Sequence, residues 1–132
     1  MTELQKIREK VSLMNVLVVD DESAIREQVV KFMKKFCQNV DSAVNGEDAF
    51  EKINQRNDYD IVLTDIRMPK MTGLELAEKI KSINENLFVA VMTGSYVLYN
   101  KINSNYDLYL DKPINLDNMK AMLETVISQK SL

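Results

Sequence analysis

The stretch IVLTD, residues 61–65, is a run of mostly branched apolar side chains that ends on a carboxylate. The same arrangement recurs three times: VLVV (16–19) precedes Asp20 and Asp21, FVAVM (88–92) precedes Thr93, and LYL (108–110) precedes Asp111 and Lys112. Runs that are almost continuously apolar are typical of strands covered on both faces in a parallel sheet. Because the carboxyl ends of parallel strands share one edge, we expect these polar side chains to meet in one crevice there.

Segments with helical periodicity separate these runs, and the alternation favours βαβ units and a mostly parallel sheet. Apolar residues recur at three- and four-residue steps in helices predicted over 22–37, 46–56, 73–83 and 115–128. A more polar segment at 39–44 suits an edge strand. We therefore predict a three-layer α/β/α sandwich whose five-stranded parallel sheet has the flavodoxin-like order 2-1-3-4-5. Its strands are expected at 15–20, 39–44, 60–65, 87–93 and 107–111.

Two segments carry weaker signals. Residues 2–14 have heptad-like apolar positions, so a short helical extension is predicted at 1–14, ahead of one domain at 15–128 and a tail at 129–132. The segment SYVLYNKINS, 95–104, should hold the fourth helix of the sandwich, but it is short and contains mediocre helix formers. We expect a short or irregular helix of one or two turns there.

Composition narrows the class of protein. The 132 residues suit one domain, and a net charge of −3 without a basic stripe argues against nucleic acid as a partner. No apolar run approaches the about 20 residues that span a bilayer, so no membrane association is expected. The N-terminal segment is too charged for a signal peptide. Cys37 is alone and histidine is absent, which excludes a disulfide framework and imidazole chemistry and fits a cytoplasmic protein.

The acids at the predicted strand ends suit a hard divalent cation. Mg²⁺ takes octahedral oxygen ligands, usually one or two carboxylates with waters and a phosphate oxygen. Asp20 and Asp21 can share one ion only if Asp21 lies in the turn past the strand, because adjacent strand residues point to opposite faces. Helix capping is the competing interpretation of the run from Asp20 to Glu22, and a turn role is the competing interpretation of Asp65.

Phosphoryl chemistry is indicated by these residues in combination. A bound cation would let clustered carboxylates ionise together, and Asp65 would then be a nucleophile able to form an acyl phosphate. Lys112 can cross the crevice as a point charge, and the Lys112–Pro113 bond is a candidate for cis geometry. Thr93 offers a hydroxyl at the next strand end. Taken singly, Lys-Pro is a common surface turn and a threonine in a strand is unremarkable.

Four motifs in this order resemble the receiver domain of two-component response regulators: VLVVDDE (16–22), DIVLTDIRMPKMTGLEL (60–76), VAVMTG (89–94) and LYLDKP (108–113). The resemblance covers about 15–128. It implies that Asp65 accepts a phosphoryl group and that Thr93 and Lys112 contact the phosphoryl oxygens. It implies a switch formed by Thr93 and Tyr109. The Mg²⁺ ligands that it implies are Asp20, Asp21, Asp65 and the backbone carbonyl of Arg67.

The resemblance also implies partners. A sensor histidine kinase or a histidine phosphotransfer protein would donate the phosphoryl group, and a downstream protein, a fused output domain or a phosphorylation-dependent homodimer would follow from it. The stretch from Thr93 to Lys112 is about one helical turn shorter than in a typical receiver. Asn105 and Tyr106 stand where a small Gly-Ala pair is common, which puts the usual dimerisation mode in doubt. Arg67 and Ser95 flank the pocket and are candidates for tuning dephosphorylation.

Two other classes of protein are compatible with such a sheet. A Mg²⁺-dependent phosphatase would need a general acid, and no residue in a suitable position is evident. An FMN-binding carrier would need a Ser/Thr/Gly-rich phosphate loop after the first strand, where the chain has DDES (20–23) instead. The sequence therefore predicts a phosphorylation-activated signalling switch, not an enzyme, whose only reactions are phosphoryl acceptance and autodephosphorylation on the chain itself.

Overall fold

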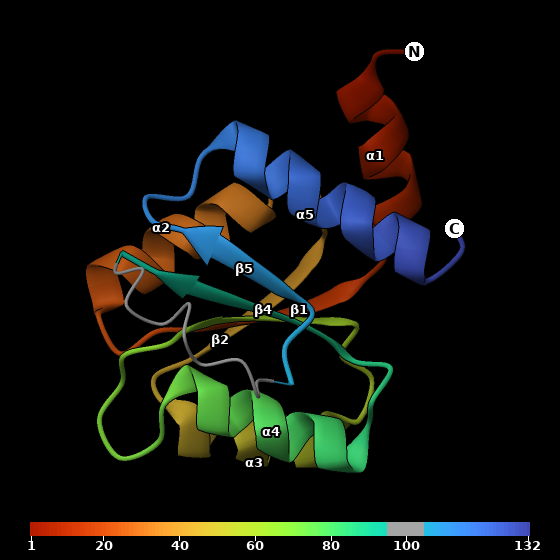
Figure 1. Cartoon of the computed structure of the whole chain (residues 1–132). Helices are drawn as coiled ribbons and strands as arrows, with labels where there is room; N and C mark the ends of the chain where they lie inside the picture. The colour runs from red at the N-terminus through yellow and green to blue at the C-terminus, as the bar shows by residue number, and fades with distance from the viewer. Residues whose placement is uncertain (95–104) are drawn as a thin grey trace.

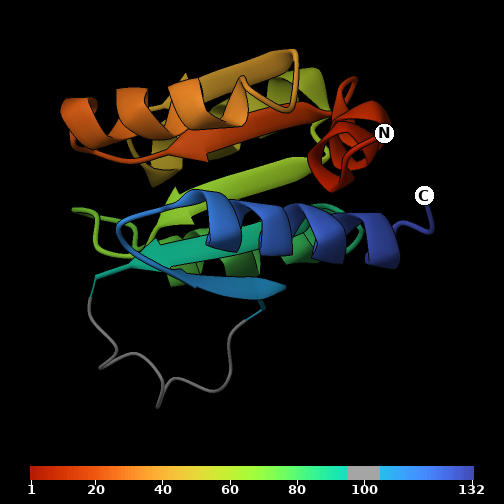
Figure 2. The same ribbon diagram turned by 90° about the horizontal axis from the view of Figure 1, so that it is seen from above.

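The fold is built on a five-stranded parallel sheet in the order β2-β1-β3-β4-β5, as predicted. The computed structural model describes residues 1–94 and 105–132. The strands are β1 Asn15–Val19, β2 Asn39–Ala43, β3 Ile61–Asp65, β4 Phe88–Thr93 and β5 Leu108–Asp111. The more polar β2 lies at an edge, as its sequence indicated, and the strands follow one another in this order in Figure 2.

Helices cover both faces of the sheet: α2 Ser23–Met33 and α5 Leu116–Gln129 on one, α3 Gly46–Arg56 and α4 Gly73–Ile83 on the other (Figure 1). Successive strand residues enter opposite cores. In β1, Val16 and Val18 belong to the core beneath α2 and α5, whereas Leu17 and Val19 belong to the core beneath α3 and α4. Because β1, β3 and β4 are buried on both faces, their side chains are mostly apolar instead of alternating.

An N-terminal helix, α1 Glu3–Val11, precedes the sheet and packs against α5. It begins with a reciprocal capping box: Thr2 Oγ1 accepts from the Gln5 backbone N–H, and Gln5 Oε1 accepts from the Thr2 N–H. Ile7 and Val11 are buried in the core beneath α5. The predicted N-terminal helix is therefore present, and it contributes apolar side chains to the core of the domain.

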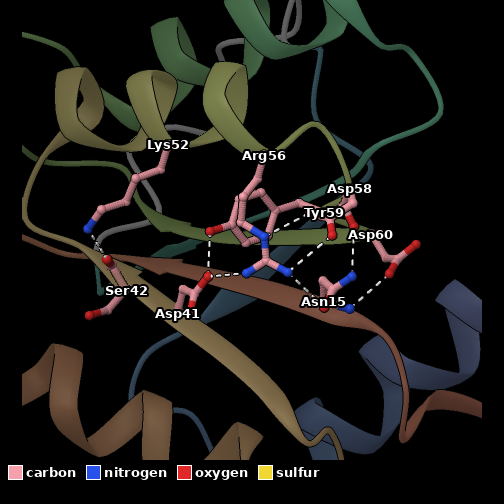
Figure 3. A network of polar contacts seen from close by, with 8 residues as sticks. All are labelled: Asn15, Asp41, Ser42, Lys52, Arg56, Asp58, Tyr59 and Asp60. Atoms are coloured by element: carbon pink, nitrogen blue, oxygen red, sulfur yellow. Dashed lines mark hydrogen bonds and ion pairs between the residues drawn. The ribbon is translucent and has the colours of Figure 1, made fainter.

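A polar network at the amino ends of β1 and β3 ties α3 to the sheet (Figure 3). The Arg56 guanidinium donates to both carboxylate oxygens of Asp58, at 2.8 and 3.2 Å, and to Asp41 at 2.6 Å. The Tyr59 hydroxyl donates to the same Asp41 oxygen at 2.6 Å, and burial together with this contact raises the pKa of Tyr59 to about 12. These acids are satisfied within the protein, and Asp58 and Asp65 lie at opposite ends of β3.

The helix after β1 is shorter than predicted. It was expected to reach residue 37, but α2 ends at Met33. The Lys35 and Phe36 N–H groups then donate to carbonyls three residues back, at 3.1 and 3.0 Å, and close tight turns. The apolar pattern continued because Phe36 and Cys37 are buried although they are not helical. The apolar periodicity of residues 22–37 therefore indicated which side chains are buried, but it predicted a helix that is too long.

Three further observations concern single segments and residues. The short helix predicted at 95–104, and Ser95 with it, lie outside the described residues. Among the helices in the described part of the chain, none combines the length and the apolarity needed to cross a membrane. Four methionines are fully buried in the core: Met33, Met92, Met119 and Met122.

Candidate functional site

The polar residues singled out in the sequence lie together at the carboxyl edge of the sheet. Asp65 and Thr93 are the last residues of β3 and β4, while Asp20 and Lys112 directly follow β1 and β5. Asp21 lies past β1, in the turn, which is where a shared ion would require it. The parallel topology brings these segments together because the strands β1, β3, β4 and β5 are consecutive neighbours.

Lys112 joins two of the acids. Its Nζ atom lies 3.0 Å from Asp65 Oδ1 and 3.2 Å from Asp20 Oδ2. Asp20 is fully buried, Asp65 is 6% exposed, and the Lys112 side chain is 19% exposed. Carboxylates this deeply buried are tolerated when they are paired with an opposite charge. The lysine therefore neutralises part of a buried acidic site.

Asp20, Asp21 and Asp65 form an acidic cluster in which one oxygen of each lies within 4.8 Å of the others. Oxygen atoms at these separations can bind a single ion, and carboxylates are the side chains that Mg²⁺ prefers. Asp21 is exposed while the other two are buried, so the cluster is open to solvent on one side. With Lys112 charged, the three carboxylates carry two uncompensated negative charges when ionised. The residues present fit a divalent cation in number, chemistry and charge.

Hydrogen bonds hold the turn that carries Asp20 and Asp21. Glu22 N–H donates to Asp20 Oδ1 at 3.0 Å, and Arg26 Nη1 donates to the Asp20 backbone carbonyl at 2.8 Å. Arg26 was not among the residues predicted from the sequence. The available signal was a cationic side chain one turn into the helix that directly follows the acidic pair, where it can reach back to the turn.

The backbone of Asp65 packs against the start of α4. The Gly73 N–H donates to the Ile66 carbonyl at 2.8 Å, and a Cβ at position 73 would lie 2.2 Å from the Asp65 carbonyl oxygen. Only glycine permits this close approach of two backbone segments. Thr64 Oγ1 donates to the same Asp65 carbonyl at 2.9 Å. These contacts fix the main chain of Asp65 and leave its carboxylate directed to the cluster.

Burial raises the pKa of Asp65 above its ordinary value, although the Lys112 ammonium beside it opposes the shift. Burial by itself would lower the pKa of Lys112, but the carboxylates of Asp65 and Asp20 outweigh burial and raise it. The lysine is therefore held in its charged form. Lys112 favours an ionised Asp65, as does a hydrogen bond from the Ile66 backbone, and a cation bound by the cluster would act in the same direction.

Thr93 and Tyr109 lie on the same face of the sheet. Val91, two residues before Thr93, is paired in register with Tyr109 on the neighbouring strand, and residues two apart share a face. Thr93 is 2% exposed, and Tyr109 is half-buried against the core beneath α3 and α4. The Lys112 N–H donates to the Thr93 carbonyl at 3.0 Å, and the Lys112–Pro113 peptide bond is cis.

A groove of about 290 Å³ adjoins the site between α2 and the loop from β5 to α5. Ile25, Val29 and Phe32 of α2 line it, as do Pro113 and Ile114, and Lys112 belongs to both the groove and the site. Ile25 and Phe32 are half-buried, pack against the core beneath α2 and α5, and also line this groove. Arg67 is exposed in the loop after β3.

Residues 16–124 match the family model of the response regulator receiver domain. The 3',5'-cyclic-nucleotide phosphodiesterase regA of Dictyostelium discoideum is 35% identical over 123 residues, which cover 88% of this chain and 16% of that protein. The transcriptional regulatory protein DltR of Streptococcus agalactiae is 31% identical over 122 residues, covering 90% of this chain and 54% of DltR. The chain thus spans about half or less of these relatives.

Two solved receiver structures match over nearly their whole length. A response regulator receiver domain protein from Clostridium thermocellum superposes with a TM-score of 0.82 at 27% identity, covering 90% of this chain and 98% of that one. The response regulator TrrA from Thermotoga maritima, crystallised with Mg²⁺-BeF, superposes with a TM-score of 0.79 at 32% identity. That match covers 86% of this chain and 99% of TrrA.

Proposed function

Because the chain belongs to the response regulator receiver domain family, we propose that it is a phosphorylation-dependent switch in which Asp65 accepts a phosphoryl group. The donor is a phosphohistidine of a sensor histidine kinase or of a histidine phosphotransfer protein. The observation that carries this proposal is the position of Lys112 Nζ, 3.0 Å from Asp65 and 3.2 Å from Asp20. A lysine placed there pairs with the carboxylate before transfer and with phosphoryl oxygens after it.

The transfer is a displacement at phosphorus. An oxygen of the Asp65 carboxylate forms the new O–P bond while the N–P bond of the donor breaks. The electron pair of that bond returns to the imidazole ring, which leaves as a neutral group when its other nitrogen carries a proton. Such transfers depend on positioning and on neutralising the equatorial oxygens, which we assign to Lys112 and Thr93. Mg²⁺, held by Asp20, Asp21, Asp65 and the Arg67 backbone carbonyl, would neutralise further negative charge when bound.

Phosphorylation adds about −1.5 to −2 charges at a nearly buried position. This added charge triggers the conformational change. The Thr93 hydroxyl moves toward the new oxygens, and Tyr109 takes up the space that Thr93 vacates. The common face of the two side chains supports this coupling. Phosphorylation thus shifts the population between two conformations. A downstream protein or a fused output domain reads the shift, and a phosphorylation-dependent homodimer is a further form of output.

The groove beside the site supports a protein as the phosphodonor. Its apolar lining from Val29, Phe32 and Ile114 lies next to Lys112, so a partner seated there would bring its phosphohistidine close to Asp65. Sensor kinases deliver phosphoryl groups inside the cell, and we accordingly place the protein in the cytoplasm.

The test is labelling with acetyl phosphate and Mg²⁺, followed by mass spectrometry of the intact chain. The wild-type chain should gain one phosphoryl group that hydroxylamine removes, as it does from an acyl phosphate, and Asp65→Asn should gain none. Asp117→Asn is the matched control because Asp117 is an exposed carboxylate on α5. It should label like the wild type. Labelling of Asp65→Asn at the wild-type rate would overturn the proposed function.

A further inference from the structure

We propose that Arg26 is a positioning residue for the acidic cluster, whose guanidinium holds the turn of Asp20 and Asp21 so that both carboxylates face one ion. The inference rests on the proposed function only in that the cluster binds Mg²⁺. Arg26 contacts the main chain of Asp20 and not a ligand oxygen, so its role is separate from that of the ligands themselves.

The amino end of α2 lacks the side-chain cap that the other described helices have. In α1, α3, α4 and α5 the N-cap side chain accepts a hydrogen bond from a backbone N–H three residues on; these residues are Thr2, Asn45, Thr72 and Asn115. Glu22, the N-cap of α2, makes no such bond. The N-cap side-chain hydrogen bond that usually stabilises the start of a helix is therefore missing next to the turn of Asp20 and Asp21.

Arg26, in the first turn of α2, provides a hydrogen bond that holds the turn before the helix. Its backbone N–H donates to the Glu22 carbonyl at 2.9 Å, which places it in the first turn of α2. From there Nη1 reaches back to the Asp20 carbonyl at 2.8 Å. The Asp20 side chain is held separately, because Oδ1 accepts from Glu22 N–H and Oδ2 meets Lys112 Nζ. Main chain and side chain of Asp20 are thus fixed by different groups.

Charge adds to this mechanical effect. The guanidinium carries a positive charge, and it bonds the carbonyl that directly precedes Asp21. It therefore offsets repulsion among the three clustered carboxylates before an ion binds. Arg26 is half-buried, so solvent screens this charge less than it screens an exposed one. Loss of Arg26 should loosen the turn and increase repulsion, and both effects weaken ion binding without removing a ligand.

The expected loss of Mg²⁺ affinity can be compared with that caused, in other metal sites, by removing residues that orient the ligands without binding the metal. Losing such a residue typically weakens metal binding by about 10- to 100-fold. Arg26 bonds the main chain and not a ligand atom, so we expect the lower end, about tenfold weaker Mg²⁺ binding in Arg26→Met. Arg26→Lys keeps a charged donor on a flexible stem and should lose only about threefold, because the amine can still reach the carbonyl.

The experiment measures Mg²⁺ binding to the full chain by isothermal titration calorimetry, with the thermal midpoint of the metal-free chain recorded in parallel. Lys31→Met is the matched control, since Lys31 is exposed on α2 and its loss removes the same charge. In acetyl phosphate labelling, Arg26→Met should raise the half-saturating Mg²⁺ concentration about tenfold and change the rate at saturating Mg²⁺ less than about twofold. Loss of a residue that only stabilised the fold would lower the thermal midpoint, but it would not raise the half-saturating Mg²⁺ concentration while leaving the rate at saturating Mg²⁺ unchanged.

Each outcome bears on the inference. Weak binding in Arg26→Met, partial recovery in Arg26→Lys and unchanged binding in Lys31→Met support it. Wild-type affinity in Arg26→Met, or equal weakening in Lys31→Met, overturns it and leaves the proposed function intact. A wild-type chain that binds no Mg²⁺ overturns the proposed function as well. If Arg26→Met does not fold, Arg26→Lys decides: a loss of Mg²⁺ affinity supports the positioning role, and wild-type affinity overturns it.

Discussion

Gly73 contributes no side chain to the site, yet it determines where the main chain of Asp65 lies. The first turn of α4 approaches the end of β3 so closely that a Cβ at position 73 would meet the Asp65 carbonyl oxygen at 2.2 Å and the Ile66 Cα at 2.9 Å. Both neighbours are backbone atoms, so a rotamer change cannot relieve the contact. The position of Asp65, the proposed phosphoacceptor, therefore depends on a residue whose only relevant property is its small size.

Gly73→Ala should consequently destabilise the domain and slow its phosphorylation. Overpacking of this kind costs about 1 to 3 kcal/mol, and displacement of the Asp65 backbone would disturb the 3.0 Å contact with Lys112. Urea unfolding and acetyl phosphate labelling measure the two effects. Gly94→Ala is the control for stability, because nothing lies within 4 Å of a Cβ added there. Equal free energies of unfolding for both variants would contradict the close approach.

At the scale of elements, α1 is the part of the chain that precedes the region matched by the family model. It lies beside α5 in Figure 1, and Lys120 of α5 pairs with Glu3. Arg8 Nε donates to the Lys35 carbonyl at 2.7 Å, which joins α1 to the segment after α2. Val11 is fully buried. The helix is therefore joined to α5 and to the segment after α2 by polar contacts, and its buried Val11 adds to the core.

Val11→Ala should lower the free energy of unfolding by about 2 kcal/mol, because it removes two methyl groups from a buried position and leaves a cavity. Urea denaturation measured by far-UV circular dichroism provides the value. Leu13→Ala is the matched control: Leu13 follows α1 and is 74% exposed, so the change should stay within about 0.5 kcal/mol. If truncation at Val11 were as mild as at Leu13, α1 would not be part of the core.

At the scale of the whole molecule, the site exists only because the chain is folded. Lys112 and Asp20 are separated by 92 positions in sequence, and their side chains meet at 3.2 Å. The unfolded chain has no such cluster, so an ion that binds the cluster binds the native state alone. Ligand binding of this kind stabilises the whole domain by mass action.

Mg²⁺ should therefore raise the thermal midpoint of the wild-type chain. At a hundredfold excess over its dissociation constant the ion would add about 2.7 kcal/mol. Asp21→Asn should remove most of this gain with little cost to the metal-free chain, because Asp21 is exposed and its loss relieves repulsion within the cluster. Differential scanning calorimetry with Mg²⁺ or with a chelator makes the comparison. An equal Mg²⁺-induced shift in wild type and Asp21→Asn would exclude Asp21 as a ligand.

Much of the fold could be predicted because its signals are local. The apolar runs predicted β1, β3, β4 and β5 to within one residue at each end, since strands buried on both faces differ in composition from everything around them. The helix after β1 was predicted too long because the stripe that includes Phe36 reflects burial, and the turns after Met33 also bury their side chains. Apolar periodicity does not distinguish these two backbone conformations.

The sequence by itself determined which residues stand at the strand ends, and right-handed parallel topology then required Asp20, Asp65 and Lys112 to converge. Only the tertiary structure decided that Ile25 also lines a groove beside the site, that Arg26 reaches back to Asp20, and that Gly73 approaches the backbone of Asp65. The physical reason is the distance along the sequence over which each feature is determined. Strand ends follow from neighbours along the chain, whereas these contacts depend on the positions that loops and helices take when they pack.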